Sequence, residues 1–201
     1  MSDVSNPVMT RLTYTLLIVN LAAFALETQL GDTQLAALLL WPVGPHFRPW
    51  QLLTSAFLHA NPLHLATNMF GLWMFGRPVE RAVGSLRFAE LYGAGLATAG
   101  VTQLVVASLL TDKVPTLGAS GALFGVLAAF AILFPNRIIV LLFPPIPMKA
   151  WVFVLLYGLF ELISGVGGLQ PGIAHFAHLG GLFGGVLMAA YWRREYQELL
   201  V

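Results

Sequence analysis

The chain has 201 residues, of which 58% are hydrophobic and only 9% are charged. An ordinary soluble domain carries about 25% charged residues, so this composition excludes a soluble globular protein and predicts an all-α polytopic membrane protein. The net charge of +1 gives no attraction to nucleic acid, and the lack of cysteine excludes disulfides, thiolate metal sites and a cysteine nucleophile.

The uncharged stretches predict six transmembrane helices in a single domain that covers residues 1–201. In chain order, we expect the helices at about residues 10–28, 61–76, 87–109, 120–134, 148–164 and 173–193. The long loop after the first helix contains His46 and His59, which are predicted to be solvated or interfacial. No cleavable signal or organelle-targeting extension is apparent, so we expect the protein in a bacterial inner membrane.

Basic residues predict the orientation of these helices. Six spans place both termini on one side, and a cytoplasmic N-terminus puts most basic residues on the cytoplasmic side, as the positive-inside rule requires. The residues then predicted inside are Arg11, Arg77, Arg81, Arg87, Arg137, Lys149, Arg193 and Arg194, and those outside are Arg48 and Lys113. The second, fourth and sixth helices would therefore all run inward from the outer face, and each carries polar residues near its start.

The second helix carries His64 and Asn68, whose spacing of four residues places both on one face. Neutral histidine and asparagine can each donate a hydrogen bond to an oxyanion. Alternatively, the pair only links neighbouring helices, as polar side chains commonly do in membranes. This pair alone does not favour one interpretation over the other.

The fourth helix opens with Gly118, Ala119, Ser120 and Gly121. A serine at a helix start lies close to the free N–H groups of the first turn, which stabilise developing negative charge. The alternative is helix packing, because Gly121 and Gly125 have the spacing of small residues that let two helices approach closely.

The sixth helix contains His175 and His178, followed by Gly181 and Gly185 on nearly the same face as His178. These glycines would let the sixth helix contact the fourth and bring the His178 imidazole to Ser120. His175 is predicted to be structural or to support a loop, and not to be catalytic. No metal and no cofactor are predicted, because the chain lacks both an HExxH motif and an evident carboxylate cluster.

Glu161 lies near the outer end of the fifth helix. An ionisable residue in a membrane helix is costly unless it has a partner, so it is either a proton relay or, as we favour, paired with loop groups. No acidic third member of a catalytic triad is evident, so helix packing is expected to orient the His178 imidazole.

Together these motifs resemble the rhomboid intramembrane serine proteases. The resemblance runs from Trp50 to Gly185 and includes three motifs: HLATN (His64–Asn68), GASG (Gly118–Gly121) and HLGGLFGG (His178–Gly185). It implies a six-helix rhomboid-like bundle with Ser120 as the nucleophile and His178 as the general base. It also implies an oxyanion hole made by His64, Asn68 and the backbone N–H of Ser120, and an aromatic support for the imidazole at Phe124, where tyrosine is often seen.

The resemblance implies a protease that cleaves single-pass membrane proteins in or beside their transmembrane helix, within the lipid bilayer. The fifth helix is a plausible gate and residues 164–172 a plausible mobile cap. One alternative is a catalytically silent relative, which would be expected to lack Ser120 or His178. Another is a transporter or channel, which would need polar residues through the full membrane depth, whereas the inner halves of the second, fourth and sixth helices are apolar apart from glycines.

Overall fold

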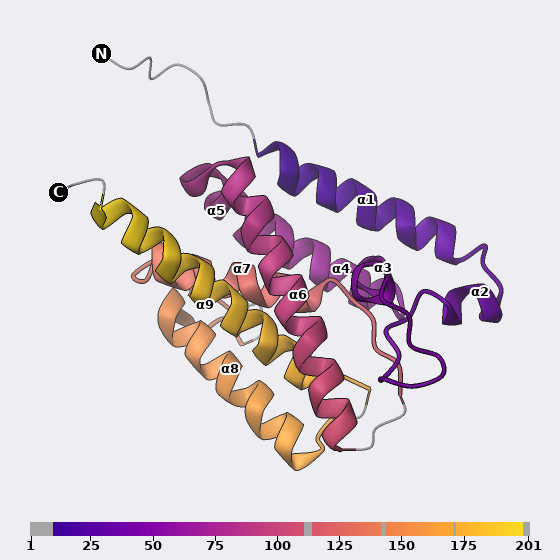
Figure 1. Ribbon diagram of the computed structural model, residues 1–201. Helices are drawn as coiled ribbons and strands as arrows, with labels where there is room; N and C mark the ends of the chain where they lie inside the picture. Colours follow the sequence, from indigo (N-terminus) through magenta and orange to yellow (C-terminus); the bar gives the residue numbers. More distant parts are fainter. Residues whose placement is uncertain (1–9, 111–113, 142–143, 171, 199–201) are drawn as a thin grey trace.

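The computed structural model describes residues 10–110, 114–141, 144–170 and 172–198, with side chains described as far as Trp192. This part of the chain is mostly helical (Figure 1). Lys113, predicted on the outer side, and Pro171, within the predicted cap, lie outside the described residues, as do both ends of the predicted domain.

The elements follow one another as a series of helices with a single small hairpin. They are α1 (Arg11–Glu27), α2 (Asp32–Ala36), α3 (Gln51–Thr54), the 3₁₀ helix η1 (Ser55–Phe57), α4 (Pro62–Gly71), the π-helical segment η2 (Leu72–Gly76), α5 (Arg77–Val83), α6 (Ser85–Leu109), α7 (Ser120–Leu133), β1 (Ile138–Val140), β2 (Pro147–Lys149), α8 (Ala150–Gly167) and α9 (His175–Glu198). The two strands pair antiparallel, with Ile139 opposite Met148.

The second predicted helix differs most from its expected bounds. It does not end near residue 76, because α4 continues through η2 into α5. Pro78 has no N–H to donate, and the wider π-helical segment just before it lets the helix continue through the proline. The helix ends at Gly84, whose φ of 82° lies in the left-handed region that favours glycine.

Helix α7 lies at the centre of the bundle, and every residue from Gly121 to Ala131 is buried. Helices α6 and α9 pack along each other and against α7, while α8 lies along the outer side of α9 (Figure 1). In the same view, α6 and α8 end at the edge of the bundle where α9 begins. The start of α9 is therefore close to the C-terminal half of α8, where Glu161 lies.

Glycines allow α7 and α9 to approach until their backbones touch. A Cβ atom on Gly181 would collide with the carbonyl oxygen of Gly121, and one on Gly185 would collide with the carbonyl oxygen of Gly125. Interiors are close-packed, so such contacts leave no room for a larger residue. The relative position of α7 and α9 is therefore fixed by these four glycines.

The apolar surface of the bundle is suited to lipid. Helices α6 and α8 are long and apolar enough to cross a membrane, and α7 is apolar but shorter, at 14 residues. In α8 only Ala150, Glu161 and Ser164 are buried, whereas Val166 and many other apolar side chains are exposed. A helix with apolar residues outward and a carboxyl group inward has the pattern of a lipid-facing helix in a polytopic protein.

A buried carboxylate joins three helices at the end of the bundle opposite the start of α9. Glu80 accepts hydrogen bonds from the backbone N–H groups of Leu12 and Thr13 (2.9 and 2.8 Å) and from the hydroxyls of Thr13 and Ser85 (both 2.6 Å). Burial alone would raise the pKa of Glu80, but the hydrogen bonds from Ser85, Thr13 and Leu12 outweigh it and lower the pKa. The ionised carboxylate therefore caps the start of α1 and joins α1 to α5 and α6.

Candidate active site

The structure brings Ser120 and His178 together. Ser120 is the first residue of α7, and His178 lies one turn into α9. The Oγ of Ser120 and the Nε2 of His178 are 2.7 Å apart, which is hydrogen-bond distance. Both side chains belong to the helix pair whose separation the glycine contacts fix.

Phe124 supports the imidazole from one side. Its ring is stacked on the His178 ring, with centroids 4.3 Å apart and an angle of 6° between the planes. Phe124 follows Ser120 by one helical turn, so a single helix supplies both the hydroxyl and the surface against which the imidazole rests. Tyr157 of α8 contacts the phenyl ring of Phe124 (4.8 Å between centroids) and closes this aromatic group.

His64 lies beside the loop that leads to Ser120. Gly118 has a φ of 124°, and a Cβ atom there would lie 2.9 Å from Cε1 and 3.0 Å from Nε2 of His64 and 3.5 Å from the Ser120 hydroxyl oxygen. Glycine is therefore required both by the backbone conformation and by the imidazole packed against it. The His64 ring and the Ser120 hydroxyl thus both lie next to Gly118.

The tautomer of His64 follows from its other contact. Its Nδ1 accepts a long hydrogen bond from the backbone N–H of Ala60 (3.4 Å). A neutral imidazole that accepts at Nδ1 carries its proton on Nε2, the nitrogen that faces Gly118. His64 therefore presents a donor on the side where Ser120 lies.

Asn68 lies one turn below His64 and is buried. Its Nδ2 donates to the backbone carbonyl of His64 (3.1 Å), which uses one of the two amide hydrogens. No hydrogen bond between Asn68 and Ser120 is present among the described residues. The second amide hydrogen is left for another acceptor.

Glu161 is the residue of this cluster that the sequence interpretation did not place beside His178. Its carboxyl oxygen Oε2 lies 3.0 Å from Nδ1 of His178 and 2.6 Å from Nδ1 of His175, and the side chain is almost fully buried. The expectation that no acidic group accompanies the imidazole is therefore wrong, as is the pairing of Glu161 with loop groups. The reason is that α8 packs against α9, so that residues 14 and 17 positions apart in the sequence face each other.

A sequence signal for this contact does exist. Between Ala150 and Trp192, Glu161 is the only Asp, Glu, Lys or Arg. A lone carboxyl group in a long apolar stretch needs a polar partner inside the bundle, and the histidines of the next helix are the nearest candidates.

The contact between Glu161 and His178 is close but not a well-formed hydrogen bond. The two atoms lie within ion-pair distance, yet the Nδ1–H direction does not point at the oxygen, and Nδ1 has no aligned partner among the described residues. His175 takes the better-aligned position at 2.6 Å and holds the backbone carbonyl of Leu169 with its other nitrogen (3.0 Å). His175 thus supports the loop before α9, in the role that the sequence suggested.

The same three side chains have the composition of a metal site, because Glu161, His175 and His178 offer ligand atoms within 4.8 Å of one another. Two ligands of one tetrahedral zinc ion lie about 3.3 Å apart, given metal–ligand bonds of about 2.0–2.1 Å. The 2.6 Å separation between Glu161 and His175 is shorter and is typical of a hydrogen bond. The side chains are therefore arranged to bind each other.

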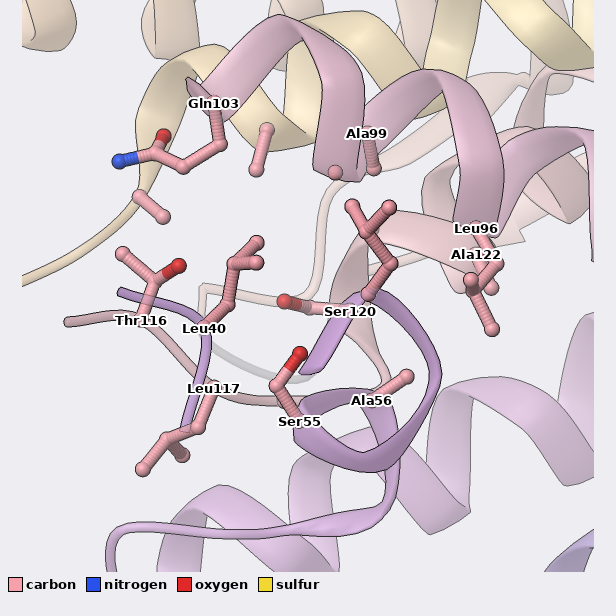
Figure 2. A pocket seen from close by; sticks show the side chains of 16 residues that line it. Leu40, Ser55, Ala56, Leu96, Ala99, Gln103, Thr116, Leu117, Ser120 and Ala122 are labelled. Carbon is pink, nitrogen blue, oxygen red and sulfur yellow. The ribbon is translucent and has the colours of Figure 1, made fainter. Parts of the chain in front are cut away.

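Ser120 also faces a small cavity. Figure 2 shows the hydroxyl groups of Ser120 and Ser55 turned toward the same space, with Gln103 and Thr116 at its far side. The cavity has a volume of about 40 Å³, and one water molecule needs about 10–15 Å³ on this measure. A larger cavity of about 360 Å³ lies next to it, is partly lined by His175 and shares Gln103 and Thr116 with it.

His59 is buried, so the prediction that it is solvated or interfacial is wrong. Only 4% of its surface is exposed, and its ring meets the His64 ring edge to face, with centroids 5.2 Å apart. Burial and the neighbouring His64 lower the pKa of His59 to about 4. The sequence could not indicate this, because it depends on the loop before α4 folding back against the bundle.

Acid should therefore destabilise the fold through His59. Its pKa in the folded state lies below the ordinary value of 6.5, so the contribution of neutral His59 is complete above pH 6.5 and is lost as the pH falls toward 4. We expect the Tm in detergent to fall over this interval, and the fall to be smaller in His59→Phe. An equal fall in His59→Phe and in a variant of the exposed His46 would contradict this assignment.

Comparison with known proteins identifies the family. A model of the rhomboid domain matches residues 46–195. Rhomboid protein 1, mitochondrial, of Saccharomyces cerevisiae is 35% identical over 149 residues, which are 73% of this chain and 43% of that protein. Rhomboid protease GluP of Bacillus subtilis is 37% identical over 142 residues, which are 70% of this chain and 25% of that protein.

A plant relative shows the same relationship. RHOMBOID-like protein 6, mitochondrial, of Arabidopsis thaliana is 33% identical over 138 residues, which are 68% of this chain and 41% of that protein. The chain thus spans less than half the length of these three curated relatives. The matched domain contains Ser120, His178 and Glu161 and implies a polytopic helical fold in a membrane. The chain belongs to the rhomboid family.

Proposed function

We propose that this protein is an intramembrane serine endopeptidase that hydrolyses peptide bonds in or next to the transmembrane segments of its substrates. The observation that carries the proposal is the 2.7 Å contact between the Ser120 hydroxyl and Nε2 of His178. A hydroxyl at the start of a helix, with a base at hydrogen-bond distance and a cavity beside it, has the arrangement of an activated nucleophile. The names of the rhomboid protease relatives support the same activity.

The reaction would proceed in two steps. The Ser120 oxygen attacks the substrate carbonyl carbon while its proton passes to Nε2 of His178, giving a tetrahedral oxyanion. The C–N bond then breaks, His178 returns the proton to the leaving nitrogen, and the acyl group remains on Ser120. Water, activated by His178, attacks the ester and releases the second product and the free serine.

The oxyanion would be held by three donors. They are the Nε2–H of His64, the second amide hydrogen of Asn68 and the backbone N–H of Ser120. His64 is favoured by its position against Gly118 and by the tautomer that the Ala60 contact selects. The helix start at Ser120 adds the partial positive charge of α7.

The contribution of Asn68 can be measured directly. We expect Asn68→Ala to lower kcat by about 10²–10³-fold with little change in KM, because an oxyanion donor acts mainly in the transition state. Thr67→Ala is the matched control, since Thr67 donates its hydroxyl to the same His64 carbonyl but is exposed. If both variants lose kcat equally, the effect comes from the helix backbone and not from an oxyanion contact.

The proposed topology has six transmembrane helices in one domain, with both termini in the cytoplasm of a bacterium and the protein in its inner membrane. The six segments are α1, α4 with η2, α6, α7, α8 and α9. In Figure 1, α6 and α8 run in one direction and α9 runs back in the opposite one, as expected of the third, fifth and sixth segments in this order. The active site would then lie near the outer face, and its partners would be single-pass membrane proteins presented from the bilayer.

Access to the site would be controlled by α8 and the segment of residues 164–172. Helix α8 buries few side chains, and the larger cavity opens beside this segment. Cross-linking α8 to α4 should slow cleavage of transmembrane substrates. Unchanged cleavage after complete cross-linking would contradict the gating role.

The decisive experiment for the proposed function uses the full chain in liposomes. A fluorophosphonate probe should label the wild type but not Ser120→Ala, and a panel of single-pass substrates should be cleaved only by the wild type. A protein that folds and neither labels nor cleaves would instead be a catalytically silent member of the family.

A further inference from the structure

We propose that Glu161 is a positioning residue of the serine–histidine site: its carboxylate holds the Nδ1 side of the His178 imidazole so that Nε2 faces Ser120. The inference rests on the proposed protease function and extends it from two groups to three. In this arrangement, α8 supplies the negative charge that lies beside the His178 imidazole during acyl transfer.

The geometry places the imidazole between two partners. Ser120 lies 2.7 Å from Nε2, and Glu161 lies 3.0 Å from Nδ1 on the opposite side of the ring. A carboxylate only accepts hydrogen bonds, so it draws the single proton of a neutral imidazole to Nδ1. Nε2 is then free to accept the Ser120 proton, whereas the other tautomer could not act as a base.

The interaction becomes stronger when the proton is transferred. In the resting state the Nδ1–H is not aligned with the Glu161 oxygen, so the contact restrains the ring only weakly. Once His178 carries two protons, a positive ring lies 3.0 Å from the carboxylate in a buried environment. Charge-assisted hydrogen bonds are about twice as strong as neutral ones, so the carboxylate favours the transition state over the ground state.

His175 holds the carboxylate in place. Its Nδ1 lies 2.6 Å from the same Glu161 oxygen, and its Nε2 lies 3.0 Å from the Leu169 carbonyl. A carboxylate and a carbonyl both only accept, so the two contacts are made together by an imidazole that donates from both nitrogens. The ring is therefore anchored at Leu169 and fixes the position of Oε2. His175 and His178 share one carboxyl oxygen. The polar groups that interact with His178 from neighbouring helices are His64 of α4, Glu161 of α8 and Ser120 of α7, and Tyr157 of α8 interacts with Glu161.

The burial pattern of α8 supports a functional reason for this residue. Helix α8 buries only three side chains, two of which are polar, while its apolar side chains face outward. A carboxyl group at this depth is costly in a membrane, and a leucine would pack against α9 at lower cost. The contact with the imidazole gives the carboxyl group a role that packing alone does not explain.

The test compares carboxylate variants of the full chain in liposomes, with a single-pass substrate that the wild type cleaves. We expect Glu161→Gln to lower kcat by about 100-fold and to change KM by no more than about twofold. A serine protease that loses the aspartate of its triad loses about 10⁴-fold in kcat. The loss expected here is smaller because Phe124 still holds the His178 ring. Glu161→Asp keeps the charge and should recover most of the lost kcat. The rate of fluorophosphonate labelling should fall and recover in parallel.

Two further variants separate positioning from structural support. His175→Gln removes one anchor of the carboxylate and should lower kcat by no more than about 10-fold, well short of the loss in Glu161→Gln, because Glu161 remains beside His178. Ser164→Ala changes a buried hydroxyl one turn along α8 that has no hydrogen-bond partner among the described residues, and should leave kcat unchanged. Equal kcat in folded Glu161→Gln and the wild type would overturn the proposal.

The outcome remains decisive if Glu161→Gln does not fold. In that case a folded His175→Gln whose kcat falls about 100-fold would show that the carboxylate serves His175, and would overturn the proposal. Activity that depends on added Zn²⁺ and is lost with a chelator would overturn it in favour of a metal site at these three residues. A wild type that neither cleaves nor labels refutes the proposed protease function instead, so the two failures are distinguishable.

Discussion

Replacing Ser120 with alanine is expected to reduce cleavage of a transmembrane substrate to the uncatalysed background. The hydroxyl is the group 2.7 Å from the base, and without it no covalent acyl intermediate can form. In a serine protease, loss of the nucleophile lowers kcat by about 10⁶-fold, and we expect a loss too large to measure here. Product formation by the purified protein in liposomes measures this loss, and KM is determined for any activity that remains.

The fold of the Ser120→Ala variant should be unaffected, because α7 is held by buried apolar residues and glycine contacts that the change does not touch. Its Tm should match that of the wild type. Ser55→Ala is the matched control, since its hydroxyl lines the same cavity (Figure 2), and among the described residues the hydroxyl that His178 meets at hydrogen-bond distance is that of Ser120. Turnover that survives in Ser120→Ala, or that is lost equally in Ser55→Ala, would refute the assignment of the nucleophile.

Replacing Gly185 with alanine is expected to cause a large loss of stability. The added methyl group would overlap the backbone carbonyl oxygen of Gly125, which a side-chain rotation cannot relieve. Overpacking a core typically costs about 1–3 kcal/mol and more when backbone must move, so we expect at least about 3 kcal/mol and a fall in Tm of about 10 °C. Thermal unfolding in detergent, followed by circular dichroism, gives this value.

Gly93 offers a matched control for this change. It also lies in a long helix, α6, but no atom lies within 4 Å of the position that its Cβ would occupy. Gly93→Ala should therefore leave Tm unchanged or raise it slightly, because alanine favours a helix by up to about 1 kcal/mol over glycine. A Gly185→Ala variant as stable as Gly93→Ala would show that α7 and α9 can separate without cost.

The positions of the long helices could be predicted because the chain consists of uncharged stretches separated by charged or proline-containing connections. Helices α1, α6, α7 and α8 occupy nearly the predicted residues. The end of the second predicted helix could not be predicted, because Pro78 normally interrupts a helix and the π-helical segment that accommodates it has no simple sequence signature.

The candidate site was predictable where it depends on residues close together in a motif. Phe124 follows Ser120 by one turn, so its place beside the site follows from helical periodicity. The contact of Glu161 with His178 depends on how α8 and α9 pack, and the burial of His59 depends on the path of a long loop. Neither follows from local sequence, although the isolation of Glu161 in an apolar stretch signals that it needs a partner.

The location of Glu161 would link the proposed reaction to the proposed gating role of α8. The carboxylate belongs to the helix that faces lipid, whereas the nucleophile and the base belong to the two helices that glycines lock together at the centre. An outward movement of α8 in the proposed gating role would take the carboxylate away from the imidazole, and closure of the helix would bring it back. Substrate entry and bond cleavage would then occur in sequence, with the three-residue arrangement complete only in the closed form.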